Sequence, residues 1–226
     1  MLAIETSAPQ LPEFRSLAVG TEIAAQTETL PNGREVVVTG DSDMRAQFLA
    51  AGNDSVANYR TSGGLLGCAQ IIRQFMPDFN TRELRDYAES LYPSLTERDI
   101  APLGSVAPEK LAQTLVDFDV PAHVEQAQSS EDLAHYIESG SGVLVAVNLG
   151  ELWNSPAYFG NGDANAVAVA LAVAREPHTG DILGWYLNDI VAKQVRTLVD
   201  APRMQRAWLD VGGWLIVTEI VRRRSE

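Results

Sequence analysis

The chain contains a single cysteine, Cys68, and its sequence setting is typical of a thiol that does chemistry. A glycine-rich turn at residues 63–67 precedes it, and an apolar stretch at residues 69–75 follows with a pattern that predicts a helix. A thiol at the start of a helix lies near the positive end of the helix dipole, which favours the thiolate. Cys68 is therefore a candidate nucleophile. The alternative is a small hydrophobic residue in the core, which is a common position for a free cysteine.

Two long strands joined by a tight turn are predicted in the second half of the chain. Residues 164–174 alternate small and bulky apolar side chains, residues 182–189 form a second apolar run, and Pro-His-Thr-Gly at 177–180 is a typical turn. The bulkier side chains of the first strand are expected on one face: Val167, Val169, Leu171 and Val173.

The register of this hairpin places polar residues together. If Glu176 pairs near Asp181, paired positions have numbers that add up to about 357. Asn165 then falls opposite the region just past Asp189. We therefore expect Asn165, Asn188 and Asp189 to lie at the same end of the sheet.

Capping and turn residues predict the remaining elements. An Asn-Gly pair between two β-prone runs indicates a hairpin, because both residues tolerate positive φ. Helices are expected at residues 41–51, 82–91, 109–118 and 131–139, and further strands at 24–30, 34–39, 122–125, 142–148 and 214–218. This order predicts an α+β fold, in which residues 1–55 form an N-terminal extension with the hairpin and residues 56–226 form the main domain.

Composition limits the class of protein. The chain has 226 residues, of which 46% are hydrophobic, enough for a full core. Acidic residues outnumber basic ones 30 to 17, for a net charge of -13, which argues against a nucleic-acid partner. The longest apolar run is too short to cross a bilayer, so no membrane partner is expected. A lone cysteine excludes an internal disulfide and suits the cytoplasm, and the sequence shows no metal or cofactor motif.

These features together resemble the papain-clan cysteine peptidases that process double-glycine bacteriocin leaders, and similar domains in bacterial toxins and effectors. The resemblance covers residues 58–218. It rests on Gly67-Cys68 before a helix and on the segments 142–148, 150–153, 165–169 and 184–189. It implies a papain-like fold, with an N-terminal helical half that carries Cys68 and a C-terminal antiparallel sheet.

The resemblance also implies roles for individual residues. Cys68 takes the nucleophile position, and Asn165 takes the position of the catalytic histidine. Asp189, or alternatively Asn188, would orient the imidazole. Ser62 stands six residues before the cysteine, where such enzymes place an oxyanion-stabilising glutamine. An amide has no useful basicity, and a general base contributes about 10²–10⁴-fold, so the resemblance predicts impaired catalysis.

Three aromatic residues follow the strand predicted at 142–148. Trp153, Tyr158 and Phe159 lie in the connection to the next strand, where they could line a peptide cleft or anchor the loop.

Three functions stay open on the sequence. The first is a degenerate peptidase domain that binds a peptide or protein in its cleft. The second is an active cysteine protease or a glutamine deamidase of the bacterial effector or toxin type. The third is such an enzyme inactivated by a change of histidine to asparagine. Synthesis in the cytoplasm is expected, with delivery outside the cell by a specialised secretion system as an alternative, and the oligomeric state is not predicted.

Overall fold

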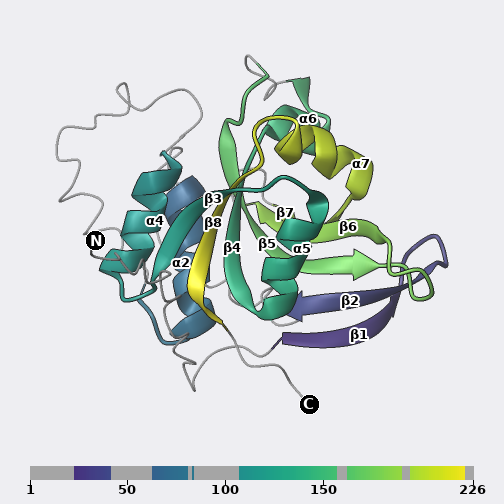
Figure 1. Cartoon of the computed structure of the whole chain (residues 1–226), viewed down its shortest axis with the longest axis horizontal. Coiled ribbons are helices and arrows are strands. Elements are labelled where there is room, and N and C mark those ends of the chain that lie inside the picture. The colour runs from purple at the N-terminus through teal and green to yellow at the C-terminus, as the bar shows by residue number, and fades with distance from the viewer. Residues whose placement is uncertain are drawn as a thin grey trace, which may run out of the picture.

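A computed structural model describes residues 23–41, 63–80, 83, 107–156, 162–189 and 194–221 (Figure 1). It shows a mixed fold of helices and an antiparallel sheet, so the predicted α+β class is confirmed at this level. The strands are β1 (Ile23–Thr29), β2 (Glu35–Asp41), β3 (Ala122–Gln126), β4 (Ser141–Val147), β5 (Ala166–Arg175), β6 (Ile182–Asp189), β7 (Gln194–Asp200) and β8 (Trp214–Val221). The helices are α2 (Gly63–Phe75), α4 (Pro108–Asp117), α5 (Ser130–Ser139), α6 (Leu149–Trp153), α7 (Ala201–Met204) and the π-helical turn η3 (Gln205–Leu209).

Strand β5 is the centre of the sheet. The described strands follow the order β1-β2-β5-β4-β8-β3, while β6 pairs with β5 and β7 pairs with β6. Residues 166–170 of β5 pair with β4, and residues 172–175 pair with β2. Because all pairs are antiparallel, the C-terminal ends of β4 and β6 and the N-terminal end of β5 lie at one end of the sheet.

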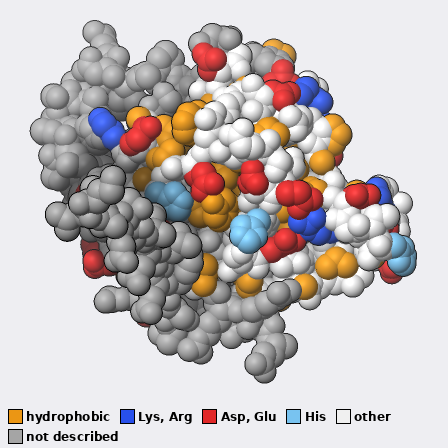
Figure 2. Space-filling view, in the orientation of Figure 1, with side chains coloured by type: hydrophobic (Ala, Val, Ile, Leu, Met, Phe, Trp, Pro, Cys, Tyr) orange, Lys and Arg blue, Asp and Glu red, His pale blue; other side chains and the backbone are white. Residues whose placement is uncertain are grey.

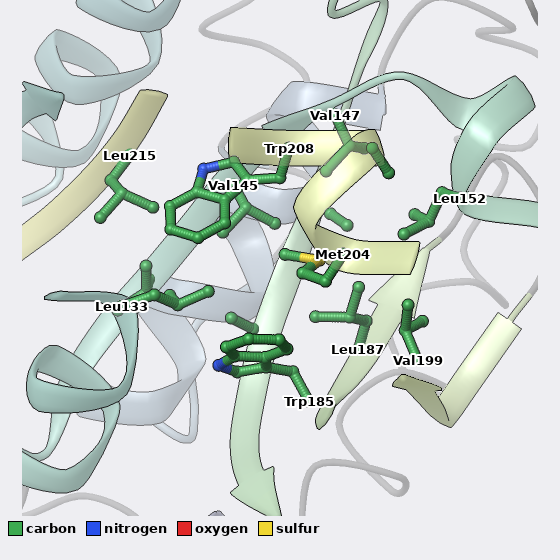
Figure 3. Packing of buried hydrophobic residues seen from close by; sticks show 14 of the residues in the cluster. Leu133, Val145, Val147, Leu152, Trp185, Leu187, Val199, Met204, Trp208 and Leu215 are labelled. Atoms are coloured by element: carbon green, nitrogen blue, oxygen red, sulfur yellow. The ribbon is translucent and has the colours of Figure 1, made fainter. Parts of the chain in front are cut away.

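The sheet has a separate core on each face. Helices α2 and α4 cover one face, which we call the α2 face. The core on this face includes Cys68 and Leu111. Helices α5, α6 and α7 cover the opposite face, called the α5 face, where Trp185 and Trp208 pack among aliphatic side chains (Figure 3). Strands that are buried on both faces need apolar side chains at every position, which explains the continuous apolar sequence of β5.

A β-bulge in β5 changes which of its side chains point to each face of the sheet. Val167, Val169 and Leu171 lie on the α2 face as predicted, but Val173 belongs to the core of the α5 face. The prediction for Val173 is wrong because the pairing of β5 with β6 shifts by one residue between positions 170 and 172. A one-residue shift moves the following side chains to the other face of the sheet.

The predicted N-terminal hairpin is confirmed as β1 and β2. Gly33 lies in its turn with φ of 82°, a conformation that glycine adopts without strain. The hairpin is part of the main sheet, because residues 37–40 of β2 pair with residues 172–175 of β5. The division into residues 1–55 and 56–226 therefore stays a prediction, with the hairpin attached to the larger unit through the sheet.

The helices predicted at 41–51 and 82–91 lie almost entirely outside the described residues. Helices α4 and α5 are confirmed, with Pro108 in the first turn of α4 and Gly140 left-handed at the end of α5. The sequence pattern does not predict β7, α7 or η3, although Asp200 before Ala-Pro is a helix-start signal and its carboxylate accepts from the Arg203 N–H at 2.9 Å. None of the helices in the described ranges combines the length and apolar character that a bilayer crossing requires.

Candidate functional site

Cys68 lies inside helix α2. The helix begins at Gly63, so the cysteine is more than one turn past its start. The side chain of Cys68 is 0% exposed, and its thiol donates a hydrogen bond to the backbone carbonyl of Leu111 in α4, with an Sγ–O distance of 3.6 Å. The thiol therefore points into the contact between two helices.

The burial of Cys68 opposes formation of the thiolate. Desolvation raises the pKa of the thiol far above its usual value, because a charged sulfur would lose its hydration in an apolar core. The prediction that the helix start lowers this pKa is wrong. Since the dipole effect is confined to the first turn of a helix, a residue beyond that turn gains little from it.

The glycines before Cys68 have a packing role. They are helical residues of α2, whereas the sequence pattern indicated a turn. A Cβ atom on Gly64 would lie 2.9 Å from Leu111 Cδ2, and one on Gly67 would lie 3.0 Å from Leu144 Cδ2. Both distances are shorter than normal contacts, so the glycines allow α2 to approach α4 and β4 closely, and this close packing buries the cysteine.

Asn165 is a hydrogen-bond partner of helix α6. It is 8% exposed, and its Oδ1 accepts from the Leu149 N–H at 3.0 Å. Asn148 lies beside it, and its Oδ1 accepts from the Glu151 N–H at 3.1 Å. The first N–H groups of a helix have no partner within the helix, so these two amides satisfy donors at the start of α6.

The register predicted for β5 and β6 is confirmed near this end. Val169 pairs with Asn188 and Ala170 with Leu187. Asn165 directly precedes β5, and Asp189 is the last residue of β6. We use the name polar end of the sheet for five of the described side chains: Asn148, Trp153, Asn165, Asn188 and Asp189.

Asn188 and Asp189 contact different faces. The Asn188 amide nitrogen donates to Gln70 Oε1 of α2 at 2.9 Å. The Asp189 carboxylate accepts from the Trp153 indole N–H at 2.6 Å. Successive side chains of a strand alternate between faces, so Asn188 lies on the face that α2 covers and Asp189 lies on the opposite face with α6.

The remaining predicted site residues have mixed outcomes. Trp153 is the last residue of α6, not part of an irregular loop, and its indole is partly buried against the core of the α5 face. Ser62, Tyr158 and Phe159 lie outside the described residues. The structure brings Trp153 to Asp189, while the thiol of Cys68 is directed to Leu111.

Sequence reasoning does not identify Gln70. This residue is fully buried in α2, and within the described residues its Nε2 has no hydrogen-bond partner. A glutamine among the apolar residues of a buried helix is the only sequence signal for it. In the same described ranges, no group of three or more His, Cys, Asp or Glu side chains is arranged to hold a metal ion.

Comparisons with known proteins give one structural likeness to report. No protein-family model matches the chain, and no curated protein matches it. Among solved structures, the chain is similar to a crystal structure of a candidate C39-like peptidase from Bacillus anthracis. The two share 13% sequence identity with a TM-score of 0.47, over 73% of this chain and 90% of that chain.

Proposed function

We propose that this chain is a papain-like cysteine peptidase domain that has lost catalysis and binds a peptide or protein at the polar end of its sheet. The layout supports this proposal in its general form. Helix α2, which carries the cysteine, packs on an antiparallel sheet, and Asn165, Asn188 and Asp189 lie at one end of that sheet. The resemblance assigns Cys68 to the nucleophile position, Asn165 to the histidine position and Asp189, or alternatively Asn188, to the position of the orienting residue. Of these last two, Asn188 contacts α2, which carries Cys68, whereas Asp189 contacts α6 on the opposite face.

The proposed loss of catalysis rests on the burial of Cys68. A nucleophile must reach a carbonyl carbon, and a thiol with no exposed surface that is bonded to Leu111 cannot do so in this conformation. The amide of Asn165 cannot accept a proton at neutral pH, and its oxygen is used by the Leu149 N–H. Loss of a general base alone removes about 10²–10⁴-fold of rate.

Trp153 is the candidate contact for a peptide. Asn148, Asn188 and Asp189 are almost fully buried, whereas Trp153 is only partly buried. Its hydrogen bond to Asp189 fixes the indole in one orientation, so little conformational entropy is lost when a ligand packs on it. Tryptophan is among the residues that most often dominate binding energy.

Binding is tested with a displayed library of random heptapeptides selected on the intact chain. Trp153→Ala is expected to weaken the selected peptides by at least about 30-fold, because a dominant contact residue contributes about 2 kcal/mol or more. Trp153→Phe retains a ring but loses the N–H to Asp189, and is expected to have an intermediate effect.

The matched control is Trp214→Ala. Trp214 is 39% exposed at the start of β8, where it pairs with Gln126 of β3. Its substitution removes an accessible indole from a strand that is two positions away from β5 in the sheet. Equal loss of peptide binding in Trp153→Ala and Trp214→Ala contradicts a site at the polar end. Failure of the intact chain to select any peptide contradicts the binding function itself.

A further inference from the structure

A carboxylate of the N-terminal hairpin is held by groups from the far side of the sheet. Glu28 of β1 forms an ion pair with the Arg196 guanidinium of β7 through Oε1. Its Oε2 accepts from the Tyr186 hydroxyl of β6 at 3.1 Å, and Gln26 of its own strand donates to Oε1 at 2.8 Å. Both oxygens of the carboxylate are therefore engaged, one by a cation and one by a hydroxyl.

The two side chains that hold Glu28, Arg196 and Tyr186, also contact each other directly. The Arg196 guanidinium carbon lies 4.4 Å from the centre of the Tyr186 ring, a distance at which the cation and the aromatic face attract each other. The side chains of Arg196 and Glu28 are 28% and 22% exposed, so the pair is shielded from water while an approach from solvent remains. Arginine in such a setting is the preferred residue for recognising carboxylates.

Arg196 has a strained backbone. Its φ of 45° lies in the left-handed region, which a residue with a long side chain adopts only at an energetic cost. The Asn188 side chain holds this conformation, because its Oδ1 accepts from the Arg196 N–H at 2.7 Å. The other end of the Asn188 amide is bonded to Gln70, so α2 fixes Asn188 in turn. Strain that is maintained in this way is a feature of ligand-binding positions.

The element that carries Glu28 is joined to the sheet over a short length. Among the described strands, β1 pairs only with β2, and β2 pairs with β5 only over residues 37–40. Glu28 reaches Arg196 from this outer strand across 168 positions of sequence. A contact from an edge strand is easier to exchange than one from the centre of a sheet.

We propose that Arg196 and Tyr186 form a binding site for a carboxylate group, which Glu28 occupies in the free chain and which the carboxylate of a peptide ligand takes by displacing Glu28. Tyr186 belongs to the core of the α2 face and Trp153 packs against the core of the α5 face, so this site differs from the proposed peptide contact at Trp153, and the proposal does not depend on the proposed function. The surface does not attract such a ligand over long distances, because acidic side chains are spread over the face seen in Figure 2 and the net charge is -13. Recognition is therefore short-range, within about 8 Å at physiological ionic strength.

The first test removes the internal carboxylate from the full chain. In Glu28→Ala, sodium propionate has the same chemistry as the missing side chain. It is expected to raise the thermal unfolding midpoint saturably, by roughly 3–6 °C at ten times its Kd. Propionamide, which has no charge, is expected to have no such effect. The wild-type chain is expected to respond little, because Glu28 already fills the site.

Two variants act as controls. Glu35→Ala removes an exposed carboxylate from the same hairpin, in the first residue of β2, and leaves the Arg196 site filled. Glu28→Ala combined with Arg196→Gln removes the receptor and should abolish the propionate response. An equal response in Glu28→Ala and Glu35→Ala overturns the proposal, and so does an equal response to propionamide.

A second measurement uses Glu28→Gln, which keeps the shape of the side chain if Glu28→Ala does not fold. Two isomeric probes, N-acetylglutamate α-amide and N-acetylglutamine, carry the carboxylate on the side chain and at the chain end respectively. Binding is followed through the NMR signals of Tyr186. At least one probe is expected to bind about tenfold or more tightly to Glu28→Gln than to wild type, because the internal competitor is weakened. The isomer that binds identifies the source of the carboxylate, and equal affinity for the two proteins overturns the proposal.

Discussion

Native Cys68 is expected to react with iodoacetamide at least about a thousandfold more slowly than the same thiol in the unfolded chain. The sulfur is 0% exposed between α2 and α4, so a reagent reaches it only when this part of the core opens. Openings that expose core residues cost several kcal/mol and are correspondingly rare. Labelling is quantified by mass spectrometry in buffer and in denaturant, and the single cysteine makes the product unambiguous.

The pH dependence of this reaction gives an independent check. A free thiol has a pKa near 8.5, so the unfolded chain should react faster as pH rises from about 7 to 9. Burial raises the pKa of native Cys68, so the native thiol stays protonated over this window. The unfolded state then binds fewer protons than the native state above about pH 8.5, and the contribution of Cys68 to stability falls as pH rises further. Cys68→Ala lacks this component. Native labelling within tenfold of the unfolded rate, with the same pH profile, contradicts the buried thiol.

Asn165→His is expected to produce no peptidase activity and to reduce stability by about 1–3 kcal/mol. An imidazole at this position supplies a base, but Cys68 stays in the core with its thiol bonded to Leu111. The substitution also removes the oxygen that accepts from the Leu149 N–H, and a buried donor without a partner costs about 1–3 kcal/mol. Stability is measured by chemical denaturation, and activity by hydrolysis of a mixed fluorogenic peptide library.

Asn165→Asp is the matched control for the stability effect. It keeps an oxygen acceptor at the same place and adds negative charge at the start of α6, where the helix dipole favours it. It should therefore lose less stability than Asn165→His. A rise in turnover of about 10²–10⁴-fold in the histidine variant, the contribution of a general base, shows that the remaining machinery is intact and contradicts our interpretation.

The sequence predicts local structure well where one physical signal decides it. The hairpin β1–β2 follows from its Asn-Gly turn, and α5 follows from a serine cap and a terminal glycine. The register of β5 with β6 near Asn188 agrees with the one predicted from the tight turn, because the pairing shifts by one residue between Ala174 and Arg175 and shifts back between Ala170 and Ala172.

The burial of Cys68 could not be predicted from local patterns. Glycine is a poor helix former, so a glycine-rich segment favours a turn on propensity alone. Packing decides otherwise here, because Gly64 and Gly67 allow contact with Leu111 and Leu144. Leu111 is 43 positions away from Cys68 in the sequence, and nothing in the sequence indicates that α4 would lie there.

Two further features depend on long-range geometry. The bulge that moves Val173 to the α5 face arises from a shift in pairing, and β5 itself contains no glycine or proline. Gly40 of β2, on which a Cβ atom would overlap the Leu171 carbonyl oxygen, packs against the bulge, but this is recognised only once the pairing of β2 with β5 is known. The contact between Glu28 and Arg196 joins positions that are 168 residues apart in the sequence. The sequence predicts the presence of Asn188 and Asp189 at one end of the sheet, but the opposite directions of their side chains only become clear from their contacts with Gln70 and Trp153.

Hydrolysis of a positional-scanning peptide library by the wild-type chain, compared with Cys68→Ala, tests the loss of catalysis most directly. Both proteins are expected to give the same background rate, because the wild-type thiol is buried and its burial raises its pKa. Turnover by the wild-type chain that disappears in Cys68→Ala would show that Cys68 acts as a nucleophile, and would contradict the proposed loss of catalysis.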